Sequence, residues 1–157
     1  MKKIAILYKN YSPIIDAIKY QLQDCEINCL TKPNEKENYD LVINLGVQYD
    51  GEALACHYSL LPAFASAEPV KEAILSGVKV TGITIYYTES KKIIAQYPVF
   101  IKNDSHYDDL EQELKYIEQT LFPLIIQKII QNEPFEVHAL MKPSCSGDCG
   151  GCKSCNH

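Results

Sequence analysis

The sequence predicts an open, mainly parallel α/β sheet with flanking helices and an antiparallel hairpin at its C-terminal side. Apolar β-type runs at 3–8, 25–30 and 39–45 are separated by a helical stretch or a polar crossover, the arrangement typical of parallel strands. Later in the chain only the segment TESKK separates two long β-type runs, which indicates a hairpin. A chain of 157 residues with 46% hydrophobic residues is enough for one domain with an ordinary core.

The first half of the chain contains three predicted strands and one helix. After the strand at 3–8, Ser12 is a candidate N-cap and Pro13 suits the first helical position. Ile14, Ile15, Ile18 and Leu22 then fall on one helical stripe, so we expect a helix from about 13 to 23. Strands at 25–30 and 39–45 follow, with the turn residues Lys32-Pro33-Asn34 between them.

The second half begins with a short strand at 53–57 and a helix at 68–76 that Gly77 ends. The run KVTGITIYY at 79–87 is rich in β-branched residues and predicts a strand. In the next strand, 93–101, Pro98 favours an edge position or a bulge.

The last predicted element is a helix over 107–131, where apolar residues recur at helical spacing. We expect Pro123 to kink or divide this helix. Periodicity is lost after Pro134, so the predicted domain covers residues 1–140 and a tail covers 141–157.

Charge and hydropathy exclude some classes of partner. The 20 acidic and 15 basic residues give a net charge of −5, and no basic block suits a run of phosphates, so we expect no nucleic-acid partner. The apolar run at 4–8 is too short for a signal-peptide core or a membrane span. We therefore expect a cytoplasmic protein, without a membrane partner, whose cysteines stay reduced.

Four short motifs follow one another at regular positions. These are HYSLLPAF at 57–64, GVKVTGIT at 77–84, IIAQ at 93–96, and Glu118 followed by LFP at 121–123. In order and spacing, residues 57–130 resemble the glycinamide ribonucleotide formyltransferase family, whose core also occurs in methionyl-tRNA formyltransferase. The resemblance implies transfer of a formyl group from 10-formyltetrahydrofolate to an amine. It also implies three catalytic groups: His57, an asparagine two residues before it, and an aspartate in a loop before the IIAQ strand.

Two of these three groups are missing. Ala55 occupies the asparagine position, and Tyr58 replaces the proline that follows the histidine in the family. The segment TESKK leaves no room for the loop with the aspartate; Glu89 can replace that carboxylate only if the short loop folds it toward His57. His57 is then either a catalytic group or a residue that fixes a turn through a hydrogen bond to the backbone.

The expected small-molecule site lies at the ends of the first and third strands. The family has a glycine-rich phosphate-binding turn after the first strand, whereas this chain has Lys9-Asn10-Tyr11-Ser12. Ser12 either holds an anion at the helix N-terminus or only caps the helix. A folate-like molecule is expected near Leu45, Gly46 and His57.

The tail carries a dense set of cysteines at CxxxCxxCxxC spacing: Cys145, Cys149, Cys152 and Cys155. Four thiolates in so short a segment can surround one metal centre, and both an Fe–S cluster and Zn²⁺ suit a Cys₄ set. The alternative is a tail of free thiols. Cys25, Cys29 and Cys56 are expected to be small buried hydrophobic residues, with Cys56 facing away from His57.

Two functional hypotheses follow. In one, the chain has the formyltransferase fold but lacks full formyl-transfer chemistry, and binds a metal or Fe–S cluster through its tail, with a redox or metal-delivery protein as partner. In the other, it is a folate-dependent formyltransferase that acts on a small amine through His57 and Glu89.

Overall fold

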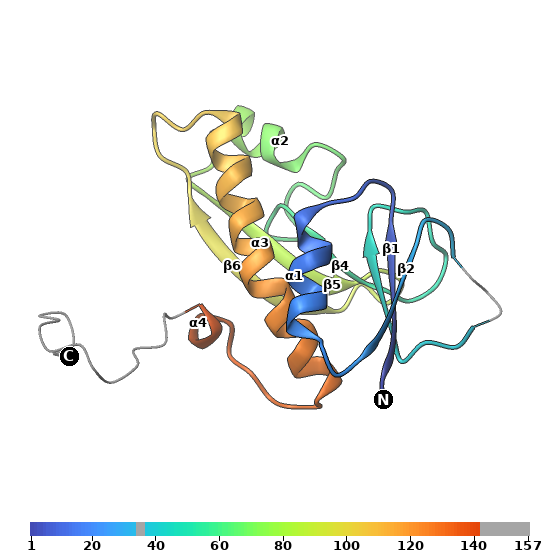
Figure 1. The fold of residues 1–157 in the computed structure, drawn as a ribbon. Helices are drawn as coiled ribbons and strands as arrows, with labels where there is room; N and C mark the ends of the chain where they lie inside the picture. Colours follow the sequence, from blue (N-terminus) through green and yellow to red (C-terminus); the bar gives the residue numbers. More distant parts are fainter. Residues whose placement is uncertain (34–36, 142–157) are drawn as a thin grey trace, which may run out of the picture.

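The protein folds around a mixed six-stranded sheet of order β2-β1-β3-β4-β5-β6 (Figure 1). The computed structural model describes residues 1–33 and 37–141. The first four strands in this order, β2, β1, β3 and β4, pair in parallel. β5 pairs antiparallel with β4, and β6 with β5, so the sheet changes direction at β4. The predicted fold class, including the C-terminal hairpin, is confirmed.

The first half has the predicted elements with slightly shorter bounds. The strands are β1 (Lys3–Tyr8), β2 (Glu26–Leu30) and β3 (Leu41–Leu45), and the helix is α1 (Pro13–Gln21). Pro13 occupies the first turn of α1, as expected from its fixed φ. Ile14, Ile15 and Ile18 are the buried face of this helix.

The second half consists of β4 (Leu54–His57), α2 (Pro69–Ser76), β5 (Val80–Tyr87), β6 (Ile93–Phe100), α3 (Tyr107–Ile130) and α4 (Val137–Leu140). Gly77 ends α2 in the left-handed conformation, at φ 75°. β6 is the edge strand, which explains why Pro98 is tolerated there.

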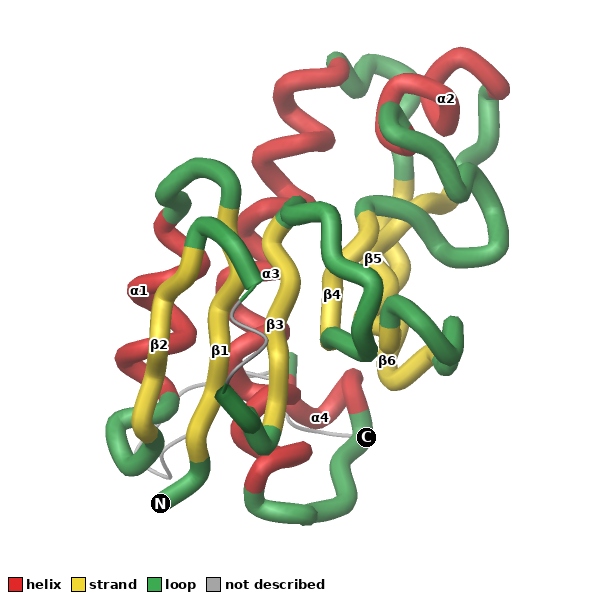
Figure 2. The backbone as a smooth tube through the Cα atoms, turned by 90° about the vertical axis from the view of Figure 1, so that its right-hand side faces the viewer, coloured by secondary structure: helices red, strands yellow, loops and turns green. Residues whose placement is uncertain are grey.

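Helices α1 and α3 lie side by side on one face of the sheet (Figure 2). They cover a core of branched aliphatic residues with one aromatic ring, Phe122. Its fully buried members include Ile4, Ile6, Ile15, Ile18, Ile43, Leu54, Ile83, Ile85, Leu110, Leu114 and Phe122.

Of the two outcomes predicted for α3 at Pro123, a kink or a division, the division does not occur. The helix runs from Tyr107 to Ile130 without division, although Pro123 lies inside it. Pro123 is buried, and so are Leu121 and Phe122 before it and Ile125 and Ile126 after it. Burial of both flanking turns against the sheet outweighs the one backbone hydrogen bond that proline removes.

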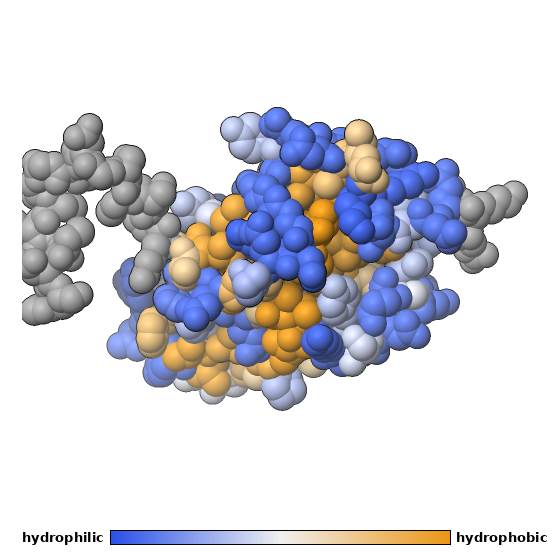
Figure 3. All heavy atoms as spheres, turned by 90° about the horizontal axis from the view of Figure 1, so that it is seen from below, coloured by the Kyte–Doolittle hydropathy of each residue, from blue (hydrophilic) through white to orange (hydrophobic). Residues whose placement is uncertain are grey.

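The short helix α4 was not predicted. It packs against β6 and α3, and with them it borders a groove of about 870 Å³ whose lining includes Tyr97, Val99, Ile117 and Met141. From below, apolar side chains reach the surface among charged ones (Figure 3).

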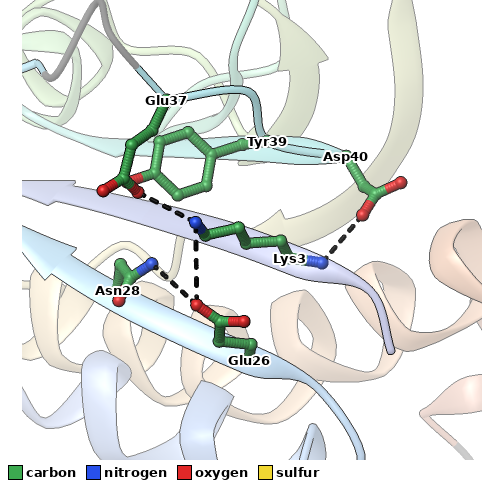
Figure 4. A network of polar contacts seen from close by, with 6 residues as sticks. All are labelled: Lys3, Glu26, Asn28, Glu37, Tyr39 and Asp40. Carbon is green, nitrogen blue, oxygen red and sulfur yellow. Dashed lines mark hydrogen bonds and ion pairs between the residues drawn. The ribbon is translucent and has the colours of Figure 1, made fainter.

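A polar network joins the starting ends of the first strands (Figure 4). Lys3 Nζ lies 3.0 Å from Glu37 and 3.7 Å from Glu26, and the Lys3 backbone N–H donates to Asp40 at 2.8 Å. The Tyr39 hydroxyl donates to Glu37 at 2.8 Å. These contacts lie at the N-terminal ends of parallel strands, opposite the end at which ligands bind in such sheets. The network therefore links β1, β2 and the segment before β3 at one edge of the sheet. The opposite edge, at the C-terminal ends of these strands, is available for a site.

Candidate active site

His57 is the last residue of β4, the strand at which the sheet changes from parallel to antiparallel pairing. Its half-buried ring lies with Nε2 at 3.0 Å from the carbonyl oxygen of Phe64. Since a carbonyl can only accept, Nε2 carries the hydrogen in this contact. In the neutral ring Nδ1 then has the lone pair and can accept a proton. The backbone hydrogen bond that the sequence analysis considered for His57 is present.

The turn that holds His57 is itself fixed by side chains of the sequence motifs. Ser59 is fully buried and its hydroxyl donates to the Ala63 carbonyl at 2.6 Å. The Thr84 hydroxyl donates to the Ser59 carbonyl at 2.6 Å and accepts from the Leu61 N–H at 3.0 Å. Gln96 donates to the Leu61 carbonyl at 2.9 Å. Sequence reasoning missed these roles of Thr84 and Gln96, although both residues lie in the motifs at 77–84 and 93–96.

A first cavity, the acidic cleft, opens at the C-terminal ends of β1, β3 and β4. Its volume is about 660 Å³. The predicted residues Ser12, Leu45, Gly46 and His57 all line it, so the structure brings them together. The Asn44 side chain, which lines the same cleft, donates to and accepts from the backbone of Val47 at 2.8 and 2.9 Å, and so shapes the turn that contains Gly46.

The acidic cleft takes its name from three carboxylates that sequence reasoning did not assign to a site: Glu68, Glu111 and Glu118. Glu118 is half-buried and accepts a hydrogen bond from the Tyr58 hydroxyl at 2.5 Å. The pKa of Glu118 is raised above its usual value because burial, the largest effect, outweighs the hydrogen bonds from Tyr58 and Cys56, which lower it.

Cys56 also lines the acidic cleft, together with His57, and is partly exposed. Cys56 was expected to be a small buried hydrophobic residue facing away from His57, but it is only partly buried and lines the same cleft as His57. The strand ends here, so side chains from both of its faces reach the cleft. Burial, and then the charge of Glu118, raise the pKa of the Cys56 thiol well above its usual value, which keeps the thiol protonated and a poor nucleophile at neutral pH.

A second cavity, the hairpin pocket, is also lined by His57 and has a volume of about 510 Å³. His57 and Ser66 line both cavities. The remaining lining residues are Leu61, Pro62, Ala65, Tyr86, Lys91 and Ile93. Lys91 is exposed at the rim and has φ 59°, a left-handed conformation set by the tight turn between β5 and β6.

Glu89 does not join His57. It is exposed, its backbone N–H donates to the Glu52 carboxylate at 3.0 Å, and it lines neither the acidic cleft nor the hairpin pocket. Ala55 is buried opposite Tyr86 and has no polar side-chain atom. A catalytic role for Glu89 stays a prediction, and Lys91 is the residue of the short turn that reaches the cavity next to His57.

The cysteine tail, with Cys145, Cys149, Cys152 and Cys155, lies outside the described residues. Within residues 1–33 and 37–141, no group of three or more His, Cys, Asp or Glu side chains is arranged to hold a metal ion. In the same part of the chain, no helix is long and apolar enough to span a membrane.

The fold and the site define a class of protein: an α/β domain with a cavity where the strand direction changes, at the carboxyl ends of the parallel strands. The sequence model of the formyl transferase family matches residues 38–126, and the chain belongs to this family. The family resemblance predicted from the sequence motifs is thus confirmed.

Individual relatives agree with this assignment. Phosphoribosylglycinamide formyltransferase of Bacillus subtilis (strain 168) is 34% identical over 86 residues, which are 52% of this chain and 44% of the relative. Methionyl-tRNA formyltransferase of Halalkalibacterium halodurans is 36% identical over 81 residues, 49% of this chain and 26% of that protein. The chain therefore spans less than half the length of these two relatives.

Solved structures share the fold. Phosphoribosylglycinamide formyltransferase from Campylobacter jejuni subsp. jejuni has 20% sequence identity and a TM-score of 0.69, with 82% of this chain and 97% of that chain covered. The arrangement of sheet and helices is thus retained at low sequence identity.

Proposed function

We propose that this protein transfers a formyl group from 10-formyltetrahydrofolate to a small amine. The observation that carries this proposal is the position of His57 in the wall of two ligand-sized cavities at once. Formyl transfer needs two substrates that meet at one proton-transferring group, and a histidine between two cavities meets this demand. Membership of the formyl transferase family supports this function over a role without catalysis.

The hairpin pocket suits the folate donor. Leu61, Pro62 and Ile93 provide apolar surface, and the Tyr86 ring adds a flat aromatic face, as an aromatic ligand requires. Lys91 at the rim provides a positive charge for a peripheral carboxylate of folate. The acidic cleft is then left for the amine.

His57 would carry the proton in the reaction. The amine nitrogen bonds to the formyl carbon, and the carbonyl electron pair moves to oxygen; when this pair returns, the bond from the formyl carbon to the folate nitrogen breaks. Nδ1 of His57 takes the proton from the amine nitrogen and returns it to the folate nitrogen, so the products are a formylated amine and tetrahydrofolate. Ala55 offers no donor to the developing oxyanion, which predicts slower turnover than an asparagine at this position would allow.

A direct assay tests this function. Purified full-length protein is mixed with 10-formyltetrahydrofolate and a panel of small primary amines, and tetrahydrofolate and formylated amine are measured by mass spectrometry. We expect the two products in equal amounts, and none without protein. The proposed transfer is wrong if the donor binds to the protein but none of the amines in the panel is formylated. It is also wrong if the protein only hydrolyses the donor to formate.

We propose in addition that the tail binds an Fe–S cluster or Zn²⁺ through Cys145, Cys149, Cys152 and Cys155. The regular CxxxCxxCxxC spacing, with glycines between the cysteines, favours this second function. A redox or metal-delivery protein would then be the partner.

Metal analysis of anaerobically purified protein tests the tail. We expect about one zinc ion or one iron–sulfur cluster per full-length chain, because four thiolates complete one tetrahedral site or one cluster. A matched chain that ends after Met141 should contain none. Equal metal content in both proteins, or no metal in either, would refute the tail site.

A further inference from the structure

We propose that the acidic cleft accepts a phosphate-free amine that carries a second, positively charged nitrogen, such as a di- or polyamine. This inference rests on the proposed function and specifies its acceptor. It concerns the cleft of about 660 Å³ beside His57, whose described lining contains three carboxylates and no lysine or arginine.

Glu118 is the carboxylate best placed to recognise a cation. It is half-buried on α3 and is held in place by the hydrogen bond from Tyr58 at 2.5 Å, which joins the end of β4 to this helix. The hydrogen bonds from Tyr58 and Cys56 use two positions on a carboxylate that has about four acceptor positions. An ammonium group can therefore bind the same carboxylate from within the cleft.

Glu111 and Glu68 add negative charge to the same cleft. Their lysine partners are exposed: Lys115 Nζ lies 3.8 Å from Glu111, and Lys71 Nζ lies 3.7 Å from Glu68. Neither lysine lines the cleft. Such exposed pairs are weak, so a cationic ligand can compete for both carboxylates.

A phosphate meets no lysine or arginine in the described lining of the same cleft, only polar groups such as Ser12. The N-termini of α1 and α2 border it, but Pro13 and Pro69 each remove one backbone N–H from the first turn. Glu68 already occupies the N-cap position of α2 and supplies the negative charge that this helix end favours. Lys9, in the segment before α1, does not line the cleft. A phosphorylated amine would therefore meet like charges.

Binding of 1,4-diaminobutane to the full-length protein, measured by calorimetry without folate, tests this inference. We expect saturable binding that Glu118→Gln weakens roughly tenfold, the size typical of one lost charged hydrogen bond. Glutamine keeps the volume and an acceptor for Tyr58. Glu111→Gln should weaken binding several-fold, whereas Glu113→Gln, on the same helix but outside the cleft, should leave it unchanged.

The inference would be overturned if inorganic phosphate or ribose 5-phosphate binds and displaces the diamine. Absence of diamine binding, or equal affinity in the Glu118→Gln, Glu111→Gln and Glu113→Gln proteins, would overturn it as well. Diamine binding without formyl transfer would refute the proposed function and retain the specificity of the cleft. Formyl transfer to a phosphorylated amine, and not to diamines, would retain the proposed function and refute the proposed specificity of the cleft.

Discussion

His57→Ala should lower kcat/KM for formyl transfer by a factor of about 10²–10⁴, the usual contribution of a positioned proton-transfer group. Nε2 is committed to the Phe64 carbonyl at 3.0 Å, so Nδ1 is the atom available to the reacting amine. Loss of the ring removes this acceptor and leaves both cavities in place. The measurement is the initial rate of tetrahydrofolate formation under single-turnover conditions.

His138→Ala is the matched control, because His138 lies on α4, outside the acidic cleft and the hairpin pocket. Its rate should equal that of the unmodified protein. Thermal melting of the His57→Ala protein separates lost chemistry from lost folding, since the Phe64 contact also stabilises the turn. An unchanged rate in a folded His57→Ala protein would assign His57 to a purely structural role.

Most elements of the fold were predictable because each has a local signal. Ser12-Pro13 marks the start of α1, and Gly77 marks the end of α2. The short TESKK segment marks the turn of the β5–β6 hairpin. Pro123 shows the limit of such signals. A proline inside a helix has a known local cost, but the burial of α3 on the sheet depends on residues distant in sequence.

The site was predictable only where a motif or the end of a predicted strand marked it. His57, Ser12, Leu45 and Gly46 were named from the sequence and line one cleft. The hydrogen bond between Tyr58 and Glu118 was not predicted, because 60 positions separate the two residues and no local periodicity links them.

The positions of the side chains in the short turn could not be predicted for a different reason. Glu89 and Lys91 are two positions apart, and which of them faces His57 depends on the backbone of the turn. Lys91 has φ 59°, and it is Lys91 that lines the hairpin pocket. A sequence pattern carries no signal for such a conformation in a residue other than glycine.

Gly82→Ala should lower the free energy of unfolding by about 3 kcal/mol, the upper part of the range for overpacked cores. A Cβ atom at Gly82 would lie 2.1 Å from the Tyr97 carbonyl oxygen on β6 and 2.7 Å from a methyl carbon of Leu60. A backbone carbonyl in a paired strand cannot move away without disturbing the ladder, in which Gly82 faces Pro98. For a chain of this size we expect a fall in Tm of roughly 6–12 °C.

Gly51→Ala is the matched control, since its added Cβ would meet only the end of the Tyr49 side chain, which can rotate away. Urea unfolding should show a change below about 1 kcal/mol for this variant. Equal stabilities of the two variants would contradict this prediction and would mean that the β6 backbone at Tyr97 moves away from the new Cβ atom at little cost. Because Leu60 belongs to the turn that carries His57, displacement by the new methyl group at Gly82 should also lower formyl transfer in the protein that remains folded. This second effect would link Gly82, the glycine of the motif at 77–84, to the chemistry through the position of the turn.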